Sequence, residues 1–570
     1  METIIFPAVL LAVVALFFLN GIRQERQKQN RMKQSLKEGY GKQPDKLWTA
    51  QQYEEIRRYH EKHKEKFEID DMTWNDLGMD EIFRRVDYTL SQTGAEYLYH
   101  TLRSPQKPKQ LAEREAKIAY YRLKQEERLT LQLEFARLGS IENYSLYDCL
   151  ERLEELEDRS LLQHYICPLA VLAAVAAMCV VPGIGVAALL VVLLYNIFSY
   201  LQEKGRIAPY LSCFTYILRM LQATGELERK KLPGIQEETE ELKRLHGELR
   251  GVWKGAWMVM GMGGSTNPFG LLWDYVRMIF HFDLIRFHGM KKAVWQHREE
   301  IERMLSVWGE LELIVNIGMY RASVEQEENA EKSCKGWCMP DFIDEGSADC
   351  FVMENGYYPL LPHAVKNSLK TGRGILLTGS NASGKSTFLK TCAVNILLAQ
   401  TFHTCLADKM VLRPGRLYSS MALKDNLLSG ESYYMVEIKA LKRVMDARLK
   451  EKGMLYCFVD EVLRGTNTVE RIAASTELLK TFVGEDILCF AATHDVELTS
   501  LLEKDYDNYH FEEALGESDV QFSYELKKGR TVTRNAIRLL KSMGYESGMV
   551  ERAEKRAEAF LRTGSWKEVQ

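Results

Sequence analysis

A nine-residue segment rich in glycine and hydroxyl groups carries the strongest chemical signal in this chain. Residues 379–387 follow the apolar run 375–378 and precede Phe388-Leu389-Lys390. Their sequence, Gly-Ser-Asn-Ala-Ser-Gly-Lys-Ser-Thr, predicts a buried strand, a tight glycine turn and the start of a helix. Backbone N–H groups in such a turn cradle phosphates, Lys385 reaches the β- and γ-phosphates, and the Ser386 hydroxyl binds Mg²⁺. The expected ATP contacts are Gly379, Ser380, Asn381, Ala382, Ser383, Gly384, Lys385, Ser386 and Thr387.

Two further apolar runs end in side chains that suit phosphate chemistry. Residues 454–459 precede Asp460 and Glu461, and residues 487–493 precede His494. Near-continuous apolar runs are typical of parallel strands that are buried on both faces. We expect Asp460 to join Ser386 in holding Mg²⁺, and Glu461 to activate the attacking water as a general base. We interpret His494 as a sensor of the γ-phosphate, so the predicted catalytic residues are Lys385, Glu461 and His494. The alternatives are a solvated acidic turn and a structural histidine.

These motifs together resemble the ATPase domain of the MutS family, the mismatch-repair branch of the ABC ATPases. The resemblance rests on residues 379–387, on V-D-E-x-x-R-G-T-x-T at 459–468 and on A-T-H-D-x-E-L-T at 492–499. Residues 429–437, S-G-E-S-Y-Y-M-V-E, are similar to the family's signature segment, which acts in trans. The resemblance implies ATP hydrolysis with Mg²⁺ in a homodimer, with Ser432 facing the nucleotide of the partner chain.

The resemblance extends on both sides of the core motifs and spans about residues 336–560. Residues 338–343, Cys-Met-Pro-Asp-Phe-Ile, resemble the family's entry strand and imply that Phe342 stacks on the adenine. The stretches 86–98 and 102–105 resemble the opening of the helical core that links the ATPase to DNA in this family. The alternative for these two stretches is an unrelated helical spacer.

The two modules with which the family touches DNA are not recognisable in this sequence. We recognise no mismatch-reading domain before residue 86. Residues 250–290 hold a Gly/Met/Trp-rich apolar stretch where the family has a basic clamp, so the role of that stretch stays open. A net charge of −4 gives no overall basic footprint for nucleic acid. Two hypotheses therefore remain: a switch that engages DNA, and a switch that acts on an unidentified protein or membrane partner without nucleic acid. A full ABC exporter is disfavoured, because substrate-pathway helices are lacking.

Two apolar blocks predict a membrane protein. Residues 3–19 carry no charge and are followed by Arg23, Arg26, Lys28, Arg31 and Lys33. About 17 apolar residues approach the lower limit for a bilayer span, and the positive-inside rule then puts Met1 outside and the ATPase in the cytoplasm. Residues 165–200 form a second block, broken by Pro182-Gly183-Ile184-Gly185, which suits a helical hairpin that crosses and returns. The alternative is two buried core helices of a soluble protein.

We therefore predict an α/β P-loop ATPase domain of the ABC/MutS type, C-terminal to an all-α helical core that carries transmembrane helices. The eleven cysteines include no C-x-x-C pair, which fits reduced thiols in a cytoplasmic compartment. The predicted divisions are an anchor at 1–22, a cytoplasmic helical segment at 23–160, a transmembrane hairpin at 161–202, a helical lever at 203–335 and the ATPase domain at 336–570.

The charge asymmetry around the first apolar block leads to a prediction of topology. A reporter fused after residue 60 should be cytoplasmic, and a reporter fused near Gly183 should be outside, because basic residues follow Leu19 and none precedes it. Protease accessibility of each reporter in intact cells measures this directly. Recovery of the protein in the soluble fraction without detergent would instead identify both apolar blocks as core.

Overall fold

The structure is a computed structural model, in which contacts divide the chain into two compact units. Unit 1 comprises Met1–Lys64, Val86–His100 and Ala116–Ser323, and unit 2 comprises Glu65–Arg85, Thr101–Glu115 and Val324–Gln570. Two stretches of the predicted cytoplasmic helical segment thus belong with the C-terminal unit. The residues that the structure describes are 20–24, 26–141, 144–153, 156, 162–255, 258–259, 268–331, 336–344, 350–380, 383–421, 433–450, 452–464, 466–515, 520–530, 537, 540, 543–563 and 566.

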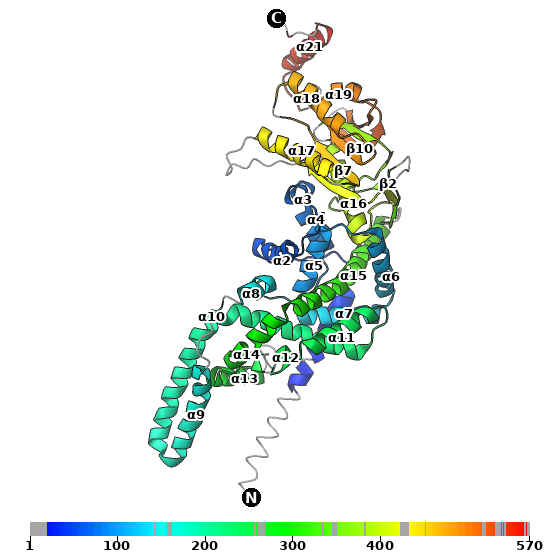
Figure 1. The fold of residues 1–570 in the computed structure, drawn as a ribbon. Coiled ribbons are helices and arrows are strands. Elements are labelled where there is room, and N and C mark those ends of the chain that lie inside the picture. The colour runs from blue at the N-terminus through cyan, green and yellow to red at the C-terminus, as the bar shows by residue number, and fades with distance from the viewer. Residues whose placement is uncertain are drawn as a thin grey trace. The chain divides into compact units, whose positions relative to one another are not determined.

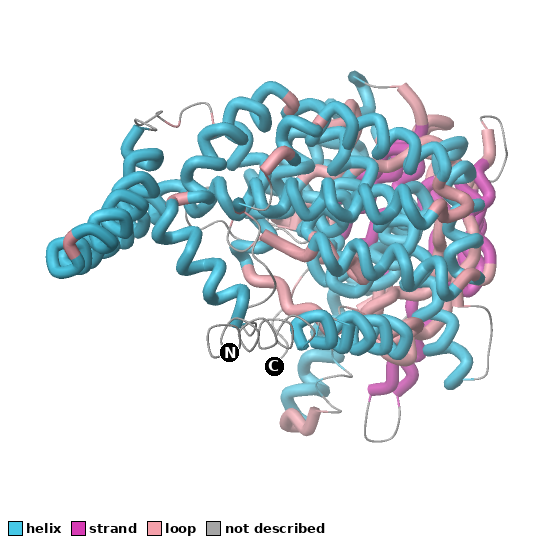
Figure 2. The backbone as a smooth tube through the Cα atoms, turned by 90° about the horizontal axis from the view of Figure 1, so that it is seen from below, coloured by secondary structure: helices cyan, strands magenta, loops and turns pink. Residues whose placement is uncertain are grey.

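Unit 1 is helical throughout its described residues, as predicted for the part that precedes the ATPase, and helices dominate Figure 2 as well. Three of its helices, α5, α6 and α15, continue along the chain into unit 2. The helices are α2 (Ala50–Lys62), α5 (Gln92–Arg103), α6 (Pro108–Leu123), α7 (Gln125–Leu138), α8 (Leu146–Arg152), α9 (Leu162–Val180), α10 (Pro182–Lys230), α11 (Gln236–Glu248), α12 (Arg250–Trp253), α13 (Pro268–Phe280), α14 (Phe282–Gln296) and α15 (Arg298–Glu331).

The Asp-x-Thr segment that opens the helical core organises buried polar contacts in unit 1. The fully buried Asp87 carboxylate accepts hydrogen bonds from Lys46 Nζ at 3.0 Å, Trp48 Nε1 at 3.0 Å and Thr89 Oγ1 at 2.6 Å. Glu312 of α15 accepts from the backbone N–H of Ser91 at 3.1 Å. A buried carboxylate is stable when its oxygens are fully hydrogen-bonded, so these contacts fix the start of α5 against α15.

Helices α9 and α10 form the hairpin predicted at the second apolar block, and Figure 1 shows them lying side by side. By length and composition, both helices could cross a membrane, and only 22% of the most apolar stretch of each is buried. Their outward faces carry large apolar side chains, a pattern that buried core helices of a soluble protein do not have. The exposed residues are Leu162, Tyr165, Ile166, Leu169, Leu172, Val175, Val180, Val181, Ile184, Val186, Leu190, Val191, Leu194, Tyr195, Phe198 and Leu201.

Unit 2 is built on two β-sheets flanked by helices, which confirms the predicted α/β class. The larger sheet has the order β10-β9-β4-β8-β7-β6, and the smaller has the order β1-β5-β2-β3. The strands are β1 (Pro340–Phe342), β2 (Phe351–Gly356), β3 (Asn367–Thr371), β4 (Gly374–Thr378), β5 (Lys409–Leu412), β6 (Gly415–Ser420), β7 (Met454–Asp460), β8 (Ile487–Ala492), β9 (Tyr506–Leu515) and β10 (Val520–Lys528). The helices that unit 2 holds entirely or almost entirely are α3 (Asp71–Leu77), α4 (Met79–Val86), α16 (Lys385–Phe402), α17 (Tyr433–Lys450), α18 (Thr468–Thr481), α19 (Val496–Leu501) and α21 (Ser547–Thr563).

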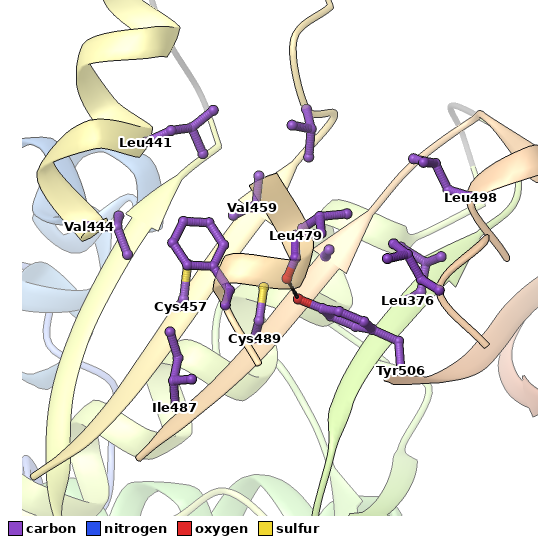
Figure 3. Packing of buried hydrophobic residues seen from close by; sticks show 14 of the residues in the cluster. Leu376, Leu441, Val444, Cys457, Val459, Leu479, Ile487, Cys489, Leu498 and Tyr506 are labelled. Carbon is purple, nitrogen blue, oxygen red and sulfur yellow. Dashed lines mark hydrogen bonds between the residues drawn. The ribbon is translucent and has the colours of Figure 1, made fainter. Parts of the chain in front are cut away.

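The central strands of the larger sheet are apolar because helices cover both of their faces. Every residue of β8 is buried, as are six of the seven residues of β7. Figure 3 shows Cys457 and Cys489 side by side within this core, and the Tyr506 hydroxyl donates to the Leu479 carbonyl at 2.8 Å. The continuous apolar runs of the sequence therefore form central parallel strands.

Helix α3, distant in sequence, attaches to the edge of the larger sheet. The Asp76 carboxylate, 2% exposed, accepts from Ser419 Oγ at 2.7 Å and from the Met421 N–H at 2.9 Å. Arg443 of α17 donates two hydrogen bonds to Asp70, at 2.6 and 2.7 Å. Because β6 is an edge strand, a helix docked there shields polar backbone that could otherwise pair with another chain.

Replacing Asp76 tests how strongly α3 holds the sheet edge. Asp76→Ala should lower the free energy of unfolding by about 1–3 kcal/mol, because it removes the acceptor of the buried Ser419 hydroxyl and of the half-buried Met421 N–H. The matched control is Glu81→Ala in α4, whose side chain is 56% exposed in an ion pair with Arg84, and it should change stability by under about 0.5 kcal/mol. Chemical denaturation measures both variants, and equal stabilities would contradict the docking role.

Candidate nucleotide-binding site

The parallel pairing of β4, β8 and β7 brings the predicted site residues together at the carboxyl ends of these strands. Leu377 pairs with Ala492, and Ala492 pairs with Asp460. The pairing continues past the strand ends, since the Glu461 N–H donates to the Ala492 carbonyl at 2.9 Å. In open α/β sheets, ligands bind outside the carboxyl ends of the parallel strands.

The glycine-rich loop has the predicted form of a turn that opens a helix. Helix α16 begins at Lys385, and its N-cap Gly384 has a φ of 102°, in the left-handed region that favours glycine. Lys385 Nζ donates to the carbonyls of Gly379 and Ser380 at 2.7 and 2.6 Å. Ser383 and Thr387 lie in the same loop and first turn, whereas Asn381 and Ala382 lie outside the described residues.

The structure brings together the two predicted metal ligands. Ser386 Oγ donates a hydrogen bond to Asp460 Oδ2. Burial raises the pKa of the Asp460 carboxyl, and this is partly offset by the hydrogen bond from Ser386. A partly buried carboxylate beside a hydroxyl is an oxygen donor set that Mg²⁺ prefers, so these residues fit the ion.

The carboxylate of Glu461 lies between two basic side chains. Its Oε1 is 2.9 Å from His494 Nε2, and its Oε2 is 2.8 Å from Arg464 Nε. The hydrogen bond with His494 lowers the pKa of Glu461, and the charges of His494, Arg464 and Lys385 lower it further. Lys385 Nζ also approaches His494 Nε2 at 3.4 Å. All three predicted catalytic residues therefore lie together, with Glu461 ionised.

A buried carboxylate that sequence analysis gave no role supports the turn after β7. Glu461 and Leu463 have φ values of 57° and 56°, which non-glycine residues adopt only when their surroundings hold them there. Glu437 of α17, 3% exposed, accepts a hydrogen bond from the Leu463 N–H. Burial raises the pKa of Glu437. The only sequence signal was its place at the end of the segment 429–437.

A pocket of about 500 Å³ adjoins the first turn of α16. Sequence analysis missed most of its lining, because the loop between β2 and β3 has no chemical motif. Besides Lys385, Ser386, Thr387, Phe388 and Thr391 of α16, it is lined by Gly356, Tyr358, Leu361, Pro362, His363, Ala364, Val365, Asn367, Gly384, Phe511 and Tyr524.

Phe342, expected to stack on the adenine, lies elsewhere in the fold. Its ring stacks on His403, with centroids 6.1 Å apart, and His403 is the C-cap of α16. Since α16 has 18 residues, this position is about 27 Å along the helix from Lys385. The adenine contact assigned to Phe342 is therefore corrected, because β1 joins the smaller sheet and pairs with β5 there. Ser432 lies outside the described residues.

Comparison with known proteins agrees with this arrangement. The family model described as MutS domain V matches residues 375–561. This match supports membership of the MutS family. The MutS domain V match begins within β4 and ends in α21, so it includes the glycine-rich loop, the Asp460-Glu461 pair and His494.

Individual proteins named for DNA mismatch repair are similar to a part of the chain. DNA mismatch repair protein MutS of Bacillus licheniformis is 27% identical over 282 residues, which are 47% of this chain and 30% of that protein. DNA mismatch repair protein MutS 2 of Haloarcula marismortui is 31% identical over 184 residues, 31% of this chain and 19% of that protein. DNA mismatch repair protein MSH3 of Yarrowia lipolytica is 26% identical over 229 residues, which are 38% of this chain and 22% of that protein. The matches thus span less than a third of each relative.

The support that Glu437 gives to the turn after β7 can be tested by two substitutions. Glu437→Leu removes the acceptor for the Leu463 N–H and should cost about 1–3 kcal/mol of stability, with slower ATP turnover because Glu461 loses its position. Glu437→Gln retains an acceptor oxygen and should stay closer to the parent protein. Thermal unfolding and steady-state ATPase assays measure both effects, and equal behaviour of the two variants would contradict the supporting role.

Proposed function

We propose that this protein binds and hydrolyses ATP with Mg²⁺ as a dimeric, membrane-anchored conformational switch of the MutS type. The observation that carries the proposal is the convergence of Lys385, Ser386, Asp460, Glu461 and His494 at one edge of a parallel sheet. The match to MutS domain V supports the same reaction.

Each residue of the site has a separate task in this proposal. Lys385 exchanges its two loop carbonyls for phosphate oxygens when the triphosphate enters beside α16. The adjoining pocket has room for the nucleobase next to Tyr358 and Tyr524. Ser386 and Asp460 would hold Mg²⁺, which supplies charge neutralisation to the phosphates when bound.

Hydrolysis requires Glu461 to be released from its basic partners. One carboxylate oxygen contacts His494 and the other contacts Arg464, and these partners hold the pKa of Glu461 low, which weakens it as a base toward water. When His494 turns to the γ-phosphate, Glu461 Oε1 becomes available. We propose that closure of a partner chain, through its segment 429–437, drives this exchange and makes activity depend on dimer formation.

Two candidate outputs follow from different observations. The relatives are DNA mismatch repair proteins, which favours a switch that engages DNA. The exposed apolar hairpin favours a switch in the cytoplasmic membrane that acts on a protein or membrane partner, with the ATPase domain in the cytoplasm.

ATPase assays on detergent-solubilised protein separate the two outputs. Turnover is measured alone and with duplex, mismatched and branched DNA, and the binding of each DNA is measured across a salt series. A steep salt dependence together with stimulation would support the DNA output, because phosphate contacts release counterions. Absence of both would favour the membrane output. Lys385→Ala should lack activity in every condition, and activity in that variant would refute the site.

The proposed role of the base predicts a trapped dimer. Glu461→Gln retains the shape of the side chain but loses its basicity, so hydrolysis should fall roughly 10²–10⁴-fold while ATP affinity survives. The variant should accumulate as a dimer with ATP and Mg²⁺, as measured by light scattering. Adding Ser432→Arg should block that dimer. Normal turnover, or a monomer under these conditions, would count against the two-chain site.

A further inference from the structure

One face of α10 carries exposed apolar residues along its first part and lines a polar pocket farther along the helix. Leu190, Leu194 and Leu201 are 59–69% exposed. The same face continues into pocket-lining residues at positions 204, 208, 211, 212, 215 and 219. Steps of three or four residues keep these positions on one side of a helix. The apolar stripe and the pocket are therefore continuous.

The pocket lies within unit 1 and has a volume of about 480 Å³. Helices α13 and α14 pack against α10 and close the pocket. Figure 1 shows both near the open end of the hairpin, away from the turn between α9 and α10. Three basic side chains, three hydroxyl groups and one carboxylate line it. The lining residues are Ser140, Ile141, Lys204, Ala208, Leu211, Ser212, Thr215, Arg219, Val259, Arg277 and Asp283.

Positive charge dominates the pocket because three basic side chains line it and only one carboxylate does. Asp283 accepts from the Tyr200 hydroxyl at 2.7 Å and from the Leu284 N–H at 3.0 Å. Lys204 Nζ donates to the Tyr200 hydroxyl at 2.8 Å, and one terminal nitrogen of Arg277 donates to the Val259 carbonyl at 2.6 Å. Arg277 also forms an ion pair with Asp274, which does not line the pocket. The pocket therefore carries more positive than negative charge in its lining, which suits an anion.

The length of the apolar stripe fits one leaflet of a bilayer. From Leu190 to Leu201 the helix rises about 16 Å, close to half of a hydrocarbon core of about 30 Å. Lys204 follows within one turn, at the depth of the head groups. Tyr275 on α13 is 59% exposed, and tyrosine is enriched at this depth in membrane proteins.

We propose that this pocket binds the phosphate head group of an anionic phospholipid whose acyl chains lie along Leu190–Leu201. The inference rests on the proposed membrane location of the hairpin. A free phosphate would use the same donors but would gain nothing from the apolar stripe, so the continuity of the two surfaces favours a lipid. Arg219, Lys204 and the Ser212 hydroxyl are the principal contacts, whereas the Thr215 hydroxyl donates to the Leu211 carbonyl at 2.8 Å.

Lipid binding to the full-length protein in detergent provides the test. Phosphatidylglycerol and phosphatidylcholine with identical acyl chains are titrated, and bound lipid is counted by native mass spectrometry. Phosphatidylglycerol should bind at least about tenfold more tightly. Lys204→Gln/Arg219→Gln should reduce that preference to about twofold or less, since each basic residue contributes roughly fivefold near an anionic surface. The control Arg244→Gln, exposed on α11 and paired with Glu248, should retain it.

The outcomes separate this inference from the proposed function. Carbonate extraction first reports whether the chain is inserted in membranes. Insertion without a preference for phosphatidylglycerol would overturn the lipid site and leave the anchor intact, whereas a protein soluble without detergent would overturn the anchor itself. Equally tight binding of glycerol phosphate, which lacks acyl chains, would identify a simple anion site and overturn the lipid assignment.

Discussion

The parallel pairing of β4, β8 and β7 is the constraint on which the candidate site depends. Hydrogen bonds continue beyond the strands, from the Thr493 N–H to the Leu377 carbonyl and from the Glu461 N–H to the Ala492 carbonyl, each at 2.9 Å. They fix the backbone just where His494 and Glu461 leave the sheet. The strained turn that follows is held by Glu437. The side chains that meet at this edge are therefore positioned by sheet register and one buried carboxylate.

Unit 1 combines a hydrogen-bonded polar interior with an exposed apolar hairpin, which soluble helical proteins seldom do. Its interior is held by satisfied buried carboxylates such as Asp87, whereas the hairpin of α9 and α10 turns leucine and valine outward. Exposed apolar area of this extent needs a nonaqueous environment or a partner. This exposed apolar area is the observation behind the proposed membrane location of the hairpin.

Local sequence patterns predicted the motifs of the site but not its long-range supports. The glycine-rich loop, the Asp460-Glu461 pair and His494 each follow an apolar strand, and this pattern together with the resemblance to the MutS family indicated that they meet. Whether Phe342 could contact the adenine depended on which end of α16 lies beside its strand. A local sequence pattern does not determine that long-range placement. The docking of α3 joins residues 343 positions apart. The pocket beside α16 is lined in large part by the irregular loop between β2 and β3. No sequence motif marks these residues, because they form a pocket only through their contacts in the folded protein.

The attachment of α3 to β6 has a consequence for how the protein is made. Asp76 leaves the ribosome long before its partner Ser419, and at about 5–20 residues per second the interval is about 17 to 70 seconds. During that time Trp74 and Leu77, buried in the finished fold, have no sheet to cover them. The nascent chain therefore carries an uncovered apolar surface at α3 through most of its synthesis.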